Sequence, residues 1–344
     1  MYRNLDAKIL GISGRQSEMI ELALTYDFKG VSIDISEFAA RAVGYGVEHV
    51  GRFHKSAEIQ IGTMELPTIW AGPEDQFKAF LETDIPRYVE VANELGATRA
   101  VVAIQPGSDE HAYKDNFELH RVRLGLIADQ LAASEIKLGL GLRAAAGLRK
   151  DVTHPFIFQA EDLLTLIKTV SAPNVGLWFD AWEWKVGGGT FEQFAEIPVD
   201  QIVAVGLADL SSEIDLVEIT DSHRLLPGQG DSIDSQAIVN ALRDAEYDGP
   251  VTPTATRESM NSRTRGQAVR EASHALEALW QGAGLSRATA PIAPAVTEEA
   301  AAKSVPQDTA EKPAAEGTAD AKVAAVATDA PDAPDTVEAE VAGE

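Results

Sequence analysis

The sequence predicts an α/β protein of the TIM (β/α)₈ barrel class, and two observations support this. Short apolar runs alternate with amphipathic stretches along residues 1–284, the order expected of a parallel sheet with a helix or long loop after each strand. The apolar runs number eight, the strand count at which such a barrel closes. A chain of 344 residues accommodates one barrel of about 250 residues plus an appendage.

The predicted strands are apolar runs that are too short and too continuous for amphipathic helices. Runs of this kind suit strands covered on both faces. In chain order they are KILGIS (8–13), GVSIDI (30–35), IQIGTM (59–64), RAVVAI (99–104), KLGLGL (137–142), VGLWFD (175–180), IVAVGLA (202–208) and PVTPTAT (250–256). Apolar residues at helical spacing predict helices between them, most clearly over 16–28, 116–133 and 264–282.

A doubly wound open sheet is the competing architecture. That fold places a glycine-rich phosphate turn, GxGxxG, after an early strand. Residues 11–18 read GISGRQSE and do not supply the motif. The barrel is therefore preferred.

The composition changes near Leu285. From Ser286 to Glu344 the chain has one isoleucine and no aromatic residue. Such a segment cannot bury enough apolar surface to offset the entropy lost on ordering. The prediction is a barrel over 1–284 followed by a disordered, acidic, Ala/Pro-rich tail over 285–344.

Charge and composition exclude several classes of function. The formal net charge of −25 repels phosphate backbones, so neither nucleic acid nor an anionic membrane is an expected partner. The absence of cysteine excludes disulfides, thiolate metal sites and cysteine nucleophiles. MYRNLDAKIL does not resemble a secretory signal, and no segment reaches the roughly 18 apolar residues of a membrane span. A cytoplasmic protein is predicted.

Several longer motifs carry a family resemblance. They are KDNFELHRVRLGLIADQL (114–131), KLGLGLRAAAGLR (137–149), THPFIF (153–158), NVGLWFDAWEW (174–184) and RLLPGQGDSID (224–234). In this order and spacing the chain resembles the sugar phosphate isomerase/epimerase family, the xylose isomerase-like TIM barrels, over roughly residues 5–282. The resemblance implies a site at the carboxyl ends of the strands.

The resemblance also implies a particular chemistry. Members of the family hold a divalent metal ion with a Glu after strand 5, an Asp after strand 6, a His on strand 7 and a Glu after strand 8. The metal polarises a sugar carbonyl or hydroxyl, and the two glutamates exchange a proton as acid and base. The activity therefore requires carboxylates at both glutamate positions.

This sequence departs from that pattern at three of the four positions. Gly141 stands at the first glutamate, Gly206 at the histidine and Thr254 at the second glutamate, while Asp180 keeps the aspartate. Next to Asp180, the DxWH motif of the family becomes DAWEW, with Glu183 replacing histidine. Glycine offers no ligand and threonine only a weak one. The resemblance thus predicts a pseudoenzyme with a degenerate metal site and no cofactor.

Ligand-binding candidates remain around the same end of the barrel. They are Arg143, Arg149, His154, Asp180, Trp182, Glu183, Asp209 and Arg224. The arginines either bind an anionic sugar or pair with the acids and fill the vacated space, and Arg257 belongs to the same group. Trp182 either packs or walls a pocket, and His154 either touches a ligand or pins its loop. Trp178, inside the sixth strand, is expected in the core.

Three functions stay open on this evidence. The first is a non-catalytic barrel that binds a sugar or sugar phosphate, or that assembles with a protein partner such as an active relative. The second is an active isomerase, epimerase or dehydratase with a rearranged site built from Asp180, Glu183 and Asp209, using Mn, Mg, Co or Zn. The third is an interaction scaffold that uses the acidic tail.

Overall fold

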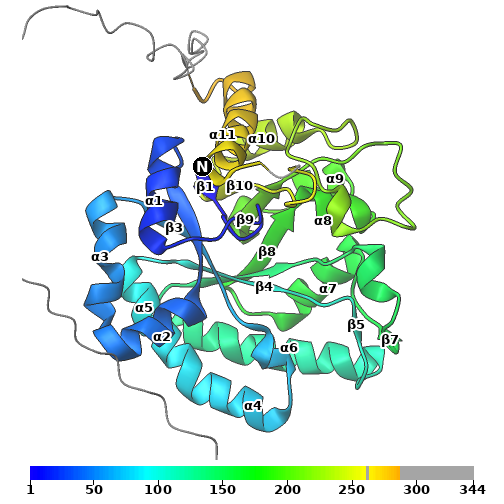
Figure 1. Cartoon of the computed structure of the whole chain (residues 1–344). Coiled ribbons are helices and arrows are strands. Elements are labelled where there is room, and N and C mark those ends of the chain that lie inside the picture. The colour runs from blue at the N-terminus through cyan, green and yellow to red at the C-terminus, as the bar shows by residue number, and fades with distance from the viewer. Residues whose placement is uncertain (261–262, 287–344) are drawn as a thin grey trace, which may run out of the picture. The chain divides into compact units, whose positions relative to one another are not determined.

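The computed structural model describes residues 1–260 and 263–286, and these form a closed parallel barrel (Figure 1). Its strands are β1 (Tyr2–Leu5), β2 (Gly30–Asp34), β3 (Gln60–Glu65), β4 (Arg99–Ala103), β6 (Lys137–Gly141), β8 (Val175–Asp180), β9 (Ile202–Leu207) and β10 (Pro250–Pro253). The order around the barrel is β1-β10-β9-β8-β6-β4-β3-β2, with every neighbouring pair parallel. The predicted (β/α)₈ barrel is confirmed. The predicted tail lies outside the described residues from position 287 on.

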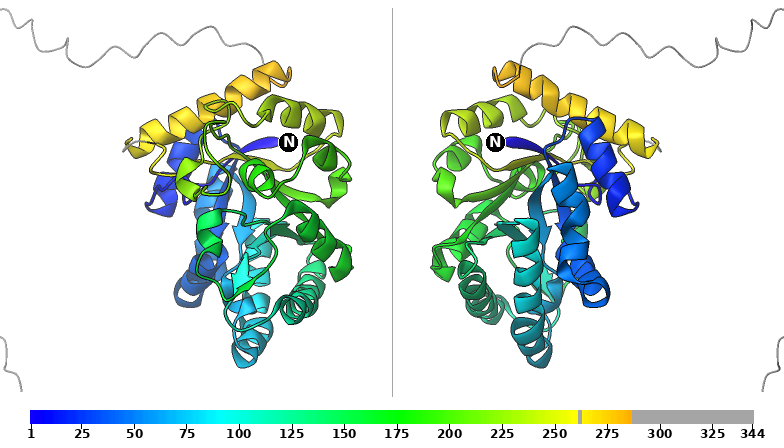
Figure 2. Two further views of the ribbon diagram at one scale, coloured as in Figure 1. Left: turned by 90° about the vertical axis from the view of Figure 1, so that its right-hand side faces the viewer. Right: turned by 90° about the vertical axis from the view of Figure 1, so that its left-hand side faces the viewer.

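Helices surround the strands, as Figure 2 shows from two sides. They are α1 (Gln16–Thr25), α2 (Ile35–Tyr45), α3 (Val47–Ala57), α4 (Glu74–Ala79), α5 (Ile85–Leu95), α6 (Tyr113–Ala132), α7 (Ala160–Val170), α8 (Ala181–Val186), α9 (Phe191–Ala195), α10 (Ser235–Asp244) and α11 (Arg265–Gly282). Two short strands, β5 (Gly107–Ser108) and β7 (His154–Pro155), pair antiparallel outside the barrel. No helix in the described part of the chain is long and apolar enough to cross a membrane.

The first predicted strand is wrong. The observed strand is Tyr2–Leu5, whereas the run KILGIS (8–13) follows it as an irregular segment. The carboxylate of Asp6 accepts a hydrogen bond from the Ile9 backbone N–H, and Gly11 has a φ of 65°, so the chain turns there. The other seven predicted strands all overlap observed ones.

Strand β8 shows which residues face the inside of the barrel. Leu177 and Phe179 belong to the hydrophobic core, whereas Asp180, one residue on, reaches groups at the carboxyl end of the barrel. Trp178 shares the inner face with Asp180 because side chains alternate along a strand. Its side chain is only partly buried and lies against Gly141 of β6. The expectation of a core Trp178 is therefore wrong: the residue lines the barrel interior.

Candidate functional site

The site at the carboxyl end of the barrel centres on a buried arginine. Arg224 follows the 3₁₀ turn η5 (Asp221–His223), and its side chain is 4% exposed. Its Nη1 donates to both carboxylate oxygens of Asp180, at 2.7 Å each, and its Nη2 donates to Oε1 of Glu183 at 2.8 Å. Nη1 also lies 3.1 Å from Oγ1 of Thr254. We call Asp180, Glu183, Arg224 and Thr254 the mouth cluster.

Both carboxylates of the mouth cluster have further partners. Asp180 is the N-cap of α8, and its Oδ1 accepts the backbone N–H groups of Trp182 and Glu183 at 3.0 Å each. The Oε2 atom of Glu183 accepts the backbone N–H of Ala144 at 2.6 Å. All four carboxylate oxygens thus accept N–H groups: Oδ1 of Asp180 and Oε2 of Glu183 from the backbone, and Oδ1, Oδ2 and Oε1 from Arg224.

Burial sets the electrostatics of this group. Burial raises the pKa of the Glu183 carboxyl to about 7, against the opposing pull of Arg224 and Arg143. Burial lowers the pKa of the Arg224 guanidinium, but Asp180 and Glu183 outweigh it and hold that pKa above its ordinary value. Arg224 therefore stays a cation, while the raised pKa of Glu183 brings its protonation close to neutral pH.

A second arginine extends the network to the surface. Arg143 donates from Nη2 to Oδ2 of Asp221 at 2.9 Å, and its Nε lies 3.6 Å from Oε1 of Glu183. Arg143 and Asp221 are each about one-third exposed. Asp221 was not among the sequence candidates, since it sits in a loop with no motif to mark it.

Trp182 has a packing role. Trp182 is fully buried in a small cluster of apolar residues from the segments that follow β6 and β9, namely Ala145, Ala208, Leu210 and Ile219. The guanidinium carbon of Arg224 lies 4.6 Å from the centre of its ring, a cation–π contact. Trp182 thus packs against the guanidinium of Arg224 and offers no surface to a ligand.

The substituted family positions are occupied by neighbouring side chains. A Cβ atom on Gly141 would lie 2.5 Å from Cε3 of Trp178, and one on Gly206 would lie 2.8 Å from Oδ2 of Asp180. The Thr254 hydroxyl already contacts Arg224. The space in which side chains at these positions would project is filled by an indole ring and an ion pair.

The residues present do not fit the divalent metal of the family pattern. Asp180 and Glu183 direct their free lone pairs at a guanidinium, and positions 141 and 206 carry no side chain. Within the described residues, no group of three or more His, Asp or Glu side chains is arranged to hold a metal ion. A metal ion would have to displace a buried arginine whose charge already compensates both carboxylates.

Three sequence candidates lie apart from the mouth cluster. Asp209 is buried, but its carboxylate accepts the backbone N–H groups of four residues: Leu210, Gly230, Ser232 and Ile233. It holds a loop together. Arg149 lies 4.1 Å above the Phe158 ring, and His154 lies on β7 beside β5. Neither side chain contacts the mouth cluster among the interactions of the described residues.

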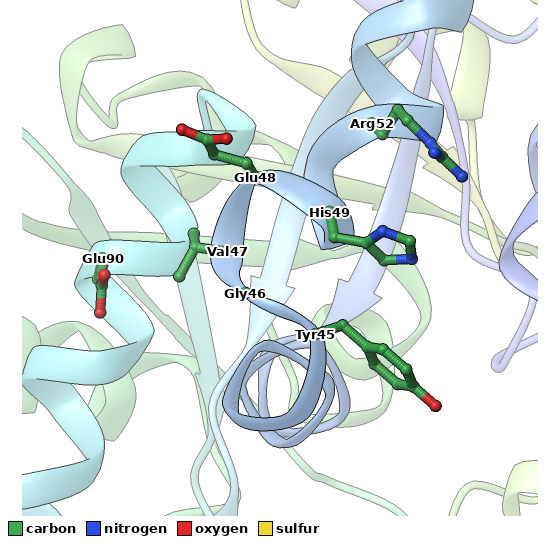
Figure 3. Close-up of a pocket in the computed structure, with 7 residues that line it drawn as sticks. All are labelled: Tyr45, Gly46, Val47, Glu48, His49, Arg52 and Glu90. Atoms are coloured by element: carbon green, nitrogen blue, oxygen red, sulfur yellow. The ribbon is translucent and has the colours of Figure 1, made fainter.

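One open hollow lies away from the mouth, around the turn between α2 and α3. It has a volume of about 610 Å³ and reaches Glu90 of α5. Figure 3 shows Val47 pointing toward the side of Glu90, whereas Tyr45 and His49 point the opposite way. The side chains diverge, so the hollow does not present converging groups to a ligand.

Comparison with known proteins agrees with this architecture. Residues 20–279 match the family model described as xylose isomerase-like TIM barrel. A xylose isomerase domain protein from Alicyclobacillus acidocaldarius is 24% identical, with a TM-score of 0.73 over 83% of this chain and 99% of that one. D-psicose 3-epimerase from Clostridium cellulolyticum H10, solved with D-tagatose, is 14% identical, with a TM-score of 0.64 over 82% and 99%.

A third solved structure is the IOLI protein with a binding zinc atom, 14% identical with a TM-score of 0.66 over 84% of this chain and 100% of that one. No curated protein matches the sequence. The solved relatives share the fold at low identity, whereas the family model spans most of the described barrel. The chain belongs to the xylose isomerase-like TIM barrel family.

Proposed function

We propose that the chain is a non-catalytic member of its family that binds a sugar-like ligand at the carboxyl end of the barrel. The observation that carries the proposal is the pairing of Arg224 with both Asp180 and Glu183, whose three side chains are 4%, 10% and 3% exposed. The guanidinium supplies the positive charge that a metal ion provides in the family pattern. Unlike a metal ion, it has no open position at which to polarise a substrate oxygen.

The proton-transfer positions support the same conclusion. Gly141 and Thr254 carry no carboxyl group, so neither can exchange a proton at a sugar carbon as the family's glutamates do. Loss of one general acid or base lowers a rate by about 10²–10⁴-fold. Loss of both, together with the metal, removes the family's reaction.

A ligand role is favoured by Trp178. Its indole ring lies on the inner face of the barrel against Gly141 and is partly exposed, unlike the fully buried Trp70 and Trp182. A partly exposed indole on the inner face of the strand that carries Asp180 suits contact with the C–H face of a sugar ring. Two D-psicose 3-epimerase structures, one solved with D-tagatose and one in the presence of D-fructose, support sugars as the ligand class.

The test combines binding with turnover. D-fructose and D-tagatose are titrated into the full chain by calorimetry, and each mixture is then followed by NMR in the presence of added Mn²⁺. We expect saturable binding that Trp178→Ala weakens strongly, with the sugar recovered unchanged. Conversion of the sugar by the wild-type chain, abolished by Glu183→Gln, contradicts the proposal.

A second candidate function follows from the electrostatics of the mouth cluster. The raised pKa of Glu183, about 7, suits a group that exchanges protons near neutral pH. An active isomerase, epimerase or dehydratase acting through Asp180 and Glu183 is therefore the alternative that the turnover assay addresses. A scaffold role of the acidic tail is tested separately, by deleting residues 286–344 and measuring association with partners.

A further inference from the structure

A second cavity lies at the carboxyl end of the barrel, as the mouth cluster does, between the segment after β1 and the segment after β10. These two strands are neighbours in the barrel, so the segments that follow them lie side by side (Figure 1). The cavity has a volume of about 210 Å³, and three arginines line it: Arg257, Arg263 and Arg265. It shares no lining residue with the mouth cluster.

Three arginines around one cavity are unusual in a chain with a net charge of −25. Arg263 pairs with Glu271 and Arg265 with Glu18, at 2.5 and 2.9 Å. Arg257 instead donates to the backbone carbonyl of Gly11, and no carboxylate of residues 1–260 or 263–286 lies within ion-pairing distance of it. The cavity wall thus carries a positive charge without a countercharge of its own.

Backbone contacts hold these guanidinium groups in place. Arg265 donates to the carbonyl of Ser13 and Arg263 to that of Met260. Gly11 makes room for Arg257, since a Cβ atom there would lie 2.6 Å from the Arg257 Cβ, and its φ of 65° suits glycine. Each guanidinium has five N–H groups, so several donors remain after these bonds are made. Arginines fixed in this way lose little entropy when they bind an anion.

We propose that this cavity binds the phosphate group of a small molecule. Guanidinium groups bind phosphate oxygens through paired, charge-assisted hydrogen bonds. One water occupies about 30 Å³ in the liquid, so the cavity is large enough for a phosphate group and the first atoms attached to it. The same chemistry serves free phosphate and a phosphomonoester, and the site is independent of sugar binding at the mouth.

Calorimetric titration of the full chain tests the proposal, with inorganic phosphate, glycerol 3-phosphate and glycerol as probes at low ionic strength. We expect both phosphates to bind and glycerol not to bind. Arg257→Gln should weaken phosphate binding about tenfold or more, the effect of losing one hydrogen bond to a charged group. Arg52→Gln, an exposed arginine of α3 on the other hollow, is the matched control and should leave binding unchanged.

The relative affinity of the probes identifies the source of the phosphate. Tighter binding of glycerol 3-phosphate supports a phosphorylated small molecule, whereas equal affinities support free phosphate. Arg265→Gln provides a second variant should Arg257→Gln disturb folding, which circular dichroism reports. No saturable binding of either phosphate, or binding that neither folded variant weakens, overturns the proposal. These results for phosphate do not test the binding of neutral sugars or of metal ions at the mouth cluster, so the two proposals can fail independently.

Discussion

Two ion pairs at the carboxyl end of the barrel have similar lengths and very different surroundings. Arg224 and Glu183 are 2.8 Å apart and their side chains are 4% and 3% exposed. Lys8 and Glu65, on the segment after β1 and the end of β3, are 2.6 Å apart but 70% and 43% exposed. Both pairs lie where a barrel of this class builds its site.

The difference shows that burial, more than distance, decides how strongly the stability of the protein depends on an ion pair. Water screens the exposed pair, which contributes about 0–1 kcal/mol. In the buried pair little solvent can replace a lost partner, so removing Arg224 leaves Asp180 with no cationic partner among the described residues and Glu183 with only Arg143, 3.6 Å away. The mouth cluster is therefore locked as a unit, whereas Lys8 and Glu65 remain free to rearrange.

The largest expected effect comes from Arg224→Met, which removes the charge and keeps much of the side-chain volume. Asp180 then has no cationic partner among the described residues and Glu183 keeps only Arg143 at 3.6 Å, so we expect the free energy of unfolding to fall by about 3–5 kcal/mol. Urea unfolding measures the change. Adding Asp180→Asn and Glu183→Gln to Arg224→Met should recover much of the lost stability. If Arg224→Met alone lowers the free energy of unfolding by less than an exposed pair contributes, the comparison is contradicted.

The pH dependence of stability is the next largest effect. The folded-state pKa of Glu183, about 7, lies above its ordinary value of 4.5, so the folded protein binds this proton more tightly than the unfolded chain does. The stabilisation is fully present below pH 4.5 and is lost as pH rises through 7. Since one pKa unit corresponds to about 1.4 kcal/mol, the loss is on the order of 3 kcal/mol.

Unfolding measured across this pH range for the wild type and Glu183→Gln isolates the effect. The wild type should lose stability relative to the variant as pH increases. Parallel pH profiles would show that Glu183 does not titrate in the cluster.

A smaller effect is expected from Gly141→Ala. The new methyl group would lie 2.5 Å from Cε3 of Trp178, so the ring has to shift, and overpacking of this kind costs about 1–3 kcal/mol. The penalty should shrink in a Trp178→Ala background. Gly125→Ala in α6 is the control: a Cβ there meets nothing within 4 Å, so it should stabilise by about 0.5–1 kcal/mol.

The smallest effect is expected from Lys8→Met. Because the pair with Glu65 is solvated, the unfolding free energy should change by less than about 1 kcal/mol. Chemical denaturation measures it beside Arg224→Met. A penalty as large as that of Arg224→Met would show that exposure does not distinguish the two pairs.

Seven of the eight strands could be predicted because they are continuous apolar runs. The first could not, because YRNL (2–5) contains an arginine and an asparagine. Arg3 is compensated by Asp27 and Glu277, and Asn4 points into the barrel toward Ser32 and Thr252, contacts between residues far apart in sequence. Tertiary pairing makes a polar segment into a central strand, and no local pattern reveals it.

The candidate site was predictable to a similar degree. The motifs identified Asp180, Glu183 and Arg224, and the structure brings all three together. Sequence alone left open whether the arginines pair with acids: Arg224 and Arg143 do, while Arg257 lines a separate cavity. The inward position of Trp178 and the partnership of Asp221 depend on how separate strands and loops meet, which one sequence does not specify.

Metal content is the most direct test of whether Arg224 takes the place of a cation. The full chain is purified from cells grown with Mn, Co, Zn and Mg, dialysed against metal-free buffer and analysed by inductively coupled plasma mass spectrometry. We expect far less than one metal ion per chain. One tightly held ion per chain, lost in Asp180→Asn and Glu183→Gln, would contradict the account.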